Sequence, residues 1–80
     1  MDLIWITKAN HIKDFIVNIT FNDGSSKNID FEPILKKRKS LFGEIMDLEK
    51  FKQFKLNDWT ISWLNGKLDI APEFLYQLTK

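Results

Sequence analysis

The feature that most constrains the fold is an apolar alternation that leads directly into a tight turn. Between positions 14 and 21, every second side chain is apolar and the others are mainly polar, which is typical of a β-strand with one buried face. The apolar members are Phe15, Val17, Ile19 and Phe21. Asn22-Asp23-Gly24 follows, and Asp-Gly favours a type I′ turn because both residues tolerate positive φ angles. We therefore predict a hairpin whose return strand covers residues 27–31.

The rest of the N-terminal half predicts one more strand and one short helix. Residues 3–9 are rich in β-favouring side chains and predict a strand that ends in a turn at Asn10–His11. Pro33 suits the first turn of a helix because the N–H it lacks has no partner there. We expect that helix to reach Lys39, and residues 40–43 to interrupt the helical pattern.

The C-terminal half contains shorter elements. Asp47 predicts the N-cap of a helix ending near Phe54. Alternation between positions 59 and 63 predicts a half-buried strand, and a short strand over 68–70 follows the Asn65–Gly66 turn. Pro72 is expected to start a last helix. Its apolar stripe would consist of Phe74, Leu75 and Leu78.

These elements predict the α+β class: a two-layer domain with a mostly antiparallel β-sheet and short helices on one face. Eighty residues, positions 1–80, fit a single domain. A domain this small buries only about 60% of its unfolded surface. The sequence contains 44% hydrophobic residues, among them three Trp and seven Phe. We therefore expect part of its apolar surface to stay exposed.

Charge and cysteine content narrow the classes of function. The chain has no cysteine, which excludes disulfides and thiolate metal sites. Its net charge of +1 gives no overall attraction to nucleic acid or anionic membranes. No apolar run approaches the roughly 20 residues that span a bilayer, and the first residues do not resemble a signal peptide. We expect a cytoplasmic protein that needs no cofactor, metal or membrane.

Three blocks of the sequence resemble the DUF2442 family of small bacterial proteins. The first joins Phe21-Asn22-Asp23-Gly24 to Ile29-Asp30-Phe31 and Pro33-Ile34-Leu35, and the second contains Leu41-Phe42 and Asp47-Leu48-Glu49-Lys50-Phe51. The most specific block contains Ile61-Ser62-Trp63-Leu64-Asn65-Gly66 and Asp69-Ile70-Ala71-Pro72-Glu73-Phe74-Leu75-Tyr76. The resemblance implies a binding or regulatory role. Some members are fused to a helix-turn-helix DNA-binding domain, and others are encoded beside a second small protein, as toxin–antitoxin partners are.

Catalytic and metal-binding patterns are weak, so we expect a protein that is not an enzyme. His11 is the only histidine and lies in a predicted turn, without a nucleophile and an orienting group beside it. Asp30, Asp69 and Glu73 could together hold a divalent cation. The simpler interpretation is that the two aspartates cap backbone N–H groups and Glu73 interacts with a helix dipole.

The strongest charge run is Lys36-Lys37-Arg38-Lys39. It could contact phosphates, with Lys50 and Lys52 extending it and Phe42 stacking on a base. The simpler interpretation is a solvated helix face, because 11 acidic residues offset the 12 basic ones.

Tryptophans are the strongest candidates for a protein-binding surface. We expect Trp59 and Trp63 on one face of a strand, and Trp5 in the first strand. Core packing is their simpler role. The alternative is a docking surface shared with Phe15 and Phe21, because tryptophan is enriched where interfaces concentrate binding energy.

The sequence favours a non-catalytic protein-binding or regulatory module. Its partner would be another protein, such as a neighbouring-gene product in a two-protein bacterial system of the toxin–antitoxin kind, or a second copy in a homodimer. Two alternatives remain. One is a nucleic-acid-associated regulator that uses residues 36–39, and the other is a mobile-element inhibitor of a defence nuclease.

Overall fold

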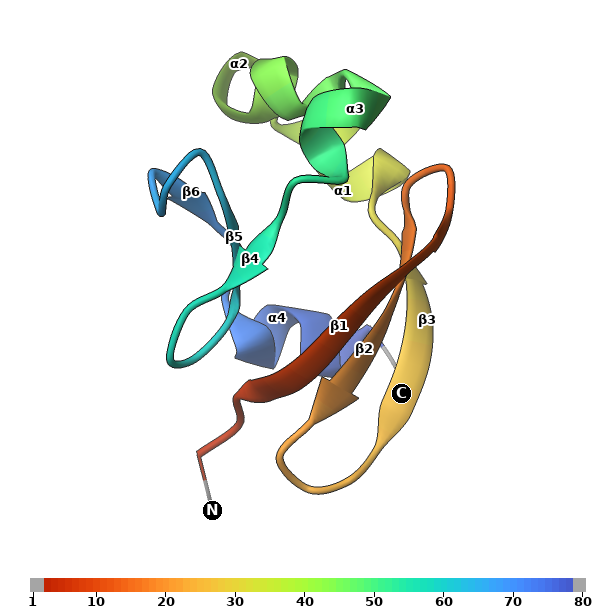
Figure 1. Cartoon of the computed structure of the whole chain (residues 1–80), viewed down its shortest axis with the longest axis vertical. Coiled ribbons are helices and arrows are strands. Elements are labelled where there is room, and N and C mark those ends of the chain that lie inside the picture. The colour runs from red at the N-terminus through yellow and green to blue at the C-terminus, as the bar shows by residue number, and fades with distance from the viewer. Residues whose placement is uncertain (1–2, 79–80) are drawn as a thin grey trace.

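The structure, a computed structural model, describes residues 3–78, which form two small antiparallel sheets and several short helices (Figure 1). The first sheet contains β1 (Ile6–Lys13), β2 (Ile16–Phe21) and β3 (Ser26–Asp30). The second contains β4 (Lys55–Leu56), β5 (Ile61–Trp63) and β6 (Leu68–Asp69). The helices are α1 (Glu32–Lys37), α2 (Lys39–Phe42), the 3₁₀ helix η1 (Gly43–Met46), α3 (Leu48–Phe51) and α4 (Pro72–Gln77).

The two sheets lie on opposite sides of the molecule in Figure 1. Helices α1, α2 and α3 gather at one end, and α4 lies toward the other. The α+β class and the antiparallel pairing are confirmed, although the strands are divided between two sheets instead of forming one.

The first hairpin turns later than the sequence predicts. β1 continues through Asn10 and His11, which pair with β2, so the predicted turn at these residues is wrong. The chain reverses after Lys13, at Asp14, whose φ is 46°. A short polar side chain such as that of Asp makes this left-handed conformation accessible. The second strand consequently starts at Ile16 rather than at position 14.

The turn between β2 and β3 also differs from its prediction. Gly24 has a φ of 88°, but Asp23 is not left-handed, so the turn is not type I′. The N–H of Gly24 donates to the Phe21 carbonyl, and the N–H of Phe21 donates to the Ser25 carbonyl. These two bonds close a three-residue loop with a glycine bulge. Asp23 accepts hydrogen bonds from the backbone N–H and the hydroxyl of Ser25, and these fix the bend.

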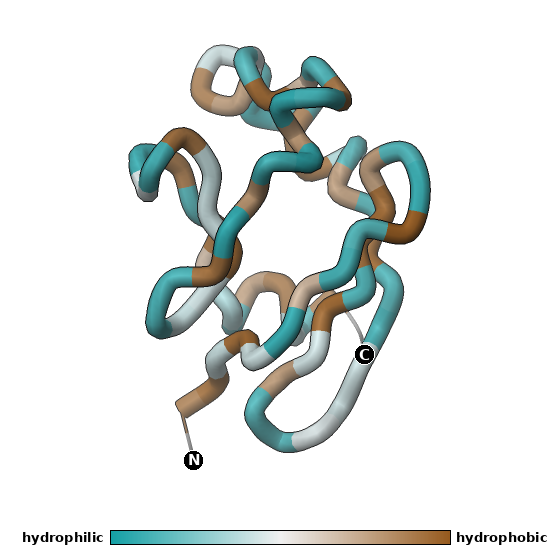
Figure 2. The backbone as a smooth tube through the Cα atoms, viewed as in Figure 1, coloured by the Kyte–Doolittle hydropathy of each residue, from teal (hydrophilic) through white to brown (hydrophobic). Residues whose placement is uncertain are grey.

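The helical end starts at Phe31, which is fully buried before α1. Helix α1 stops at Arg38, whose φ of −123° and ψ of 50° are not helical. A second short helix, α2, then covers residues that were predicted to interrupt the helical pattern. Figure 2 shows hydrophilic and hydrophobic residues interspersed along this end of the molecule. Each short helix there buries one hydrophobic residue: Leu35 in α1, Phe42 in α2, Ile45 in η1 and Phe51 in α3.

The predicted Asp47 cap is confirmed, since its carboxylate accepts a hydrogen bond from the Glu49 backbone N–H at 2.9 Å. Helix α3 nevertheless ends at Phe51, before the predicted end at Phe54. The chain then forms β4, a two-residue strand that the sequence did not indicate, and pairs with β5.

The turn between β5 and β6 is left-handed at three consecutive residues. Leu64, Asn65 and Gly66 have φ angles of 55°, 57° and 86°. Glycine accepts this conformation without a steric cost, and asparagine tolerates it, whereas leucine is strained there. Helix α4 then begins at Pro72, as predicted. Its predicted stripe is wrong in part, because only Leu75 is fully buried.

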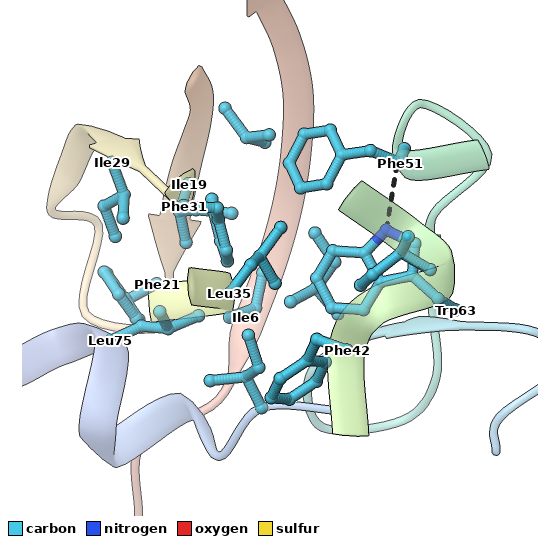
Figure 3. Close-up of a cluster of buried hydrophobic side chains, with 14 residues drawn as sticks. Ile6, Ile19, Phe21, Ile29, Phe31, Leu35, Phe42, Phe51, Trp63 and Leu75 are labelled. Atoms are coloured by element: carbon cyan, nitrogen blue, oxygen red, sulfur yellow. Dashed lines mark hydrogen bonds between the residues drawn. The ribbon is translucent and has the colours of Figure 1, made fainter. Parts of the chain in front are cut away.

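A single cluster of buried side chains connects both sheets to the helices (Figure 3). Val17, Ile19 and Phe21 come from β2, as the alternation predicts. Leu35, Phe51 and Leu75 come from the helices α1, α3 and α4, and β5 contributes Trp63. These short elements have little stability by themselves, so their shared core must stabilise them.

Candidate protein-docking surface

The loop that joins β4 to β5 carries Trp59 in a fixed backbone conformation. The side-chain oxygen of Asn57 accepts hydrogen bonds from the N–H groups of Trp59 and Thr60, each at 2.7 Å. The N–H of Asn57 donates to the Thr60 carbonyl at 2.9 Å. The buried hydroxyl of Thr60 donates to the carbonyl of Ile70. An asparagine that bonds to the backbone two residues later is a typical turn former.

The segment from Leu3 to Trp5 is held against the β2–β3 turn by one residue, Asn22. Asn22 accepts a hydrogen bond from the Trp5 N–H and donates one to the Leu3 carbonyl, both at 2.9 Å. The N–H of Asn22 also donates to the Trp5 carbonyl. The next residue, Ile6, donates its N–H to the Trp59 carbonyl at 2.9 Å, which joins this segment to the β4–β5 loop.

These two anchored segments bring Trp5 and Trp59 together. Their rings meet edge to face, with centroids 5.8 Å apart and planes at 90°. Trp59 is 52% exposed, Trp5 is half-buried, and Leu3, two residues before Trp5, is 63% exposed. We call Leu3, Trp5 and Trp59 the Trp5–Trp59 surface.

The other three aromatic residues of the predicted docking surface lie elsewhere. Trp63 and Phe21 are each 1% exposed, so a partner cannot reach them in this structure. The indole N–H of Trp63 donates to the Phe51 carbonyl at 2.9 Å (Figure 3). Phe15 is half-buried in the first turn, and its ring packs against Phe51 at 4.9 Å.

The shared strand face predicted for Trp59 and Trp63 is therefore wrong. Trp59 lies outside β5, in the loop that precedes it. β5 lies between β4 and β6 and is buried on both faces, so alternation does not separate an inner from an outer side there.

The basic run extends from the end of α1 into α2. Lys36 pairs with Glu32 at 3.4 Å, whereas Lys37, Arg38 and Lys39 make no ion pair with any carboxylate in the part of the chain that the structure describes. All four side chains are exposed.

The residues predicted to extend the basic run are two lysines paired with glutamates and one buried phenylalanine. Lys50 pairs with Glu44 at 3.5 Å, and Lys52 pairs with Glu49 at 3.2 Å. Phe42 is only 4% exposed, so it cannot stack on a base.

The predicted acidic residues act locally or stay on the surface. Asp30 accepts a hydrogen bond from the Glu32 N–H at 3.0 Å, and Glu73 lies in the first turn of α4. Asp69 is exposed in β6. Within residues 3–78, no group of three His, Cys, Asp or Glu side chains is arranged to hold a metal.

The predicted position of His11 is wrong. The residue is half-buried in β1 rather than exposed in a turn. Its Nε2 donates to the Asp14 carbonyl at 2.8 Å, so His11 supports the first turn.

An open groove of about 790 Å³ lies between the helical end and the second sheet. Its lining includes Glu44, Lys50, Gln53, Asn57, Ser62 and Asn65. The Ser62 hydroxyl donates to the Lys55 carbonyl at 3.3 Å instead of to a basic side chain. This arrangement lacks the pair of nucleophile and base that covalent catalysis requires.

Sequence reasoning missed a contact between the first hairpin and α4. The Tyr76 hydroxyl donates to Asp23 at 2.7 Å, and its ring meets Phe21 edge to face at 5.1 Å. The pKa of Asp23 is lowered from 3.8 to about 2, first by the hydrogen bond from the Ser25 hydroxyl and then by that from Tyr76. The same bond to Asp23 raises the pKa of Tyr76. No local pattern reveals this pair, because its members are 53 positions apart.

Comparison with known proteins places the chain in one family. No curated protein and no solved structure matches it significantly. None of the helices within residues 3–78 is long and apolar enough to cross a membrane. The profile described as "Protein of unknown function (DUF2442)" matches residues 6–80, nearly the whole sequence. The resemblance seen in the sequence is thus confirmed, and the chain belongs to the DUF2442 family.

Proposed function

We propose that this protein is a non-catalytic module that binds another protein through the Trp5–Trp59 surface. The observation that carries the proposal is the combination of exposure and order at Trp59. The side chain is 52% exposed, yet the Trp59 N–H donates to the Asn57 side chain and the Trp59 carbonyl accepts from the Ile6 N–H, which holds the backbone on both sides of it. A large ring that is already positioned loses little conformational entropy when it docks.

Tryptophan is enriched among the few residues that dominate interface energies. Truncation of such a residue costs about 2 kcal/mol or more of binding free energy, which is roughly a 30-fold rise in Kd. The proposal includes a cytoplasmic location and a partner from the same two-protein bacterial system. A second copy of the chain is the other form that the partner could take.

The test is an affinity pull-down from the native host, with and without nuclease, read by mass spectrometry. The baits are wild type, Trp59→Ala and the control Ile12→Ala. Ile12 is a suitable control because it is 50% exposed, close to the exposure of Trp59, but lies on β1. Thermal unfolding of each bait checks that it is folded.

We expect one stoichiometric protein that survives nuclease treatment, is lost with Trp59→Ala and remains with Ile12→Ala. Light scattering of the purified protein tests self-association, which should also depend on Trp59 if the partner is a second copy. A wild-type monomer that retains no protein, or a partner that Trp59→Ala still binds, would contradict the proposal. Release of the captured proteins by nuclease would favour a nucleic-acid-associated role.

A further inference from the structure

A small apolar hollow lies between the α1–α2 corner and the start of α4, and none of the residues that line it belongs to the Trp5–Trp59 surface. Its volume is about 200 Å³. Its lining includes Ile34, Arg38, Phe42, Ile70, Ala71 and Phe74. Small-molecule sites typically occupy about 300–1,000 Å³, so this hollow matches a single side chain better than a complete ligand.

The local backbone explains why this hollow is open. Helix α1 ends at Arg38, and the chain changes direction there before α2 begins. Phe42 then fills the core beneath the hollow, with 4% of its surface exposed. On the other side, α4 turns Leu75 into the core and leaves Phe74 47% exposed. Two aromatic residues therefore contribute to the hollow, one as part of the core and one half in solvent.

The charges around the hollow are unequally distributed. Lys37, Arg38 and Lys39 are exposed on the α1–α2 side and have no ion-pair partner among residues 3–78. Arg38 also lines the hollow itself. On the α4 side, Asp69 lines it instead. A ligand that fits should carry negative charge over α1–α2 and none over Asp69.

We propose that this hollow binds one apolar side chain of an acidic segment in a partner protein, with its carboxylates beside Lys37, Arg38 and Lys39. A peptide can place acidic residues on one side of its apolar anchor and offer a backbone N–H to Asp69. A nucleic acid carries a phosphate at every step, so Asp69 would repel it. Electrostatic complementarity of this kind selects partners and speeds their association. This second surface goes beyond the proposed function and does not depend on it.

The test uses the intact protein and a fluorescein-labelled peptide of glutamate and aspartate residues with one central leucine. The control peptide has serine in place of leucine. A single-stranded oligothymidylate of the same length tests the nucleic-acid alternative. Fluorescence anisotropy gives each Kd, and amide chemical shifts of the labelled protein show whether the peptide contacts the hollow around Ala71 and Phe74.

Two variants separate the charges from the hollow. The first removes the cations by combining Lys37→Gln, Arg38→Gln and Lys39→Gln. Its matched control removes the same charge from exposed positions on the strands: Lys8→Gln, Lys13→Gln and Lys27→Gln. The second variant, Ala71→Leu, fills the hollow from an exposed position and leaves the charges unchanged.

We expect the leucine peptide to bind with a Kd of about 1 mM or tighter, and the serine peptide about tenfold more weakly. Removing the three cations should weaken binding by about five- to tenfold, and the control triple variant by less than about twofold. Ala71→Leu should reduce the affinity for the leucine peptide to that for the serine peptide. Trp59→Ala should leave peptide binding unchanged, so this test is separate from that of the Trp5–Trp59 surface.

Three results would overturn the proposal. One is the absence of peptide binding at about 1 mM. Another is equal affinity for the leucine and serine peptides, which would mean that charge acts alone. The last is tighter binding of the oligothymidylate that is lost with the three cations and unaffected by Ala71→Leu, which would assign the basic run to nucleic acid.

Discussion

The same substitution at two tryptophans should have very different effects on stability. Trp63 is 1% exposed, and its indole N–H donates to the Phe51 carbonyl at 2.9 Å. Trp59 is 52% exposed, and its hydrogen bonds within residues 3–78 are made by its backbone. We predict that Trp63→Phe strongly destabilises the protein and that Trp59→Phe does not.

The magnitude follows from what phenylalanine cannot replace. Trp63→Phe leaves the Phe51 carbonyl unpaired in the core, which costs about 1–3 kcal/mol. It also removes apolar ring surface worth about two methylene groups, or roughly 1.5 kcal/mol. The sum is about 2.5–4.5 kcal/mol. For a domain of this size, that lowers Tm by roughly 10–36 °C.

Trp59→Phe loses ring surface that is already half in water, so we expect a change below about 1 kcal/mol. Urea unfolding followed by far-ultraviolet circular dichroism measures both variants without depending on tryptophan emission. Equal m-values would show that the comparison reflects stability alone. Equal destabilisation by the two substitutions, or a loss below about 1 kcal/mol at Trp63, would refute the core assignment of Trp63.

Two further predictions concern the turns and the acid response. Gly66→Ala should destabilise the fold by about 1 kcal/mol because the φ of Gly66 is 86°. Gly43→Ala should stabilise it by about 0.4–1 kcal/mol because Gly43 has a helical φ of −55°. Thermal unfolding measures both changes, and neither new methyl group meets an atom within 4 Å. Folding lowers the pKa of Asp23 from 3.8 to about 2. The ionised Asp23 carboxylate therefore stabilises the folded state above about pH 4, and this stabilisation is lost as the pH falls through about 2. Tyr76→Phe removes one cause of that lowering, so acid titration of Tm should show a smaller loss in this interval than in wild type; an unchanged loss would contradict the Tyr76–Asp23 bond.

Local signals predicted the parts of the fold that local chemistry determines. The alternation in β2 specified which of its residues enter the core, because one face of the strand meets the core and the other faces out. Asp47 and Pro72 marked helix starts correctly, since a cap and a proline act within one turn of the helix.

Predictions failed where distant segments decide the outcome. Asn10 and His11 resemble turn residues, but pairing with β2 keeps them in β1. Alternation from 59 to 63 is real in the sequence, yet the Asn57 side chain and the hydrogen bond from Ile6 hold Trp59 outside the strand. Neither interaction leaves a periodic trace in the sequence.

The candidate binding surfaces were only partly predictable for the same reason. From the sequence, each tryptophan could belong either to the core or to an interface. In the structure, Trp63 is buried in the core and Trp59 is exposed. The basic run was evident in the sequence, but the hollow beside it depends on a change of direction at Arg38 and on the approach of α4.

Both surfaces follow from the small size of the domain. A chain of this length has too little interior to enclose every aromatic ring, so some large side chains must remain outside. Such residues are ordinary when they are scattered singly. Trp59 differs because it contacts a second tryptophan on a backbone that is hydrogen-bonded on both sides. Phe74 differs because it borders a hollow whose opposite side carries Arg38, which makes no ion pair among residues 3–78. The ordered backbone around Trp59 and the positive charge beside the hollow are therefore the reasons to interpret these exposed residues as binding surfaces.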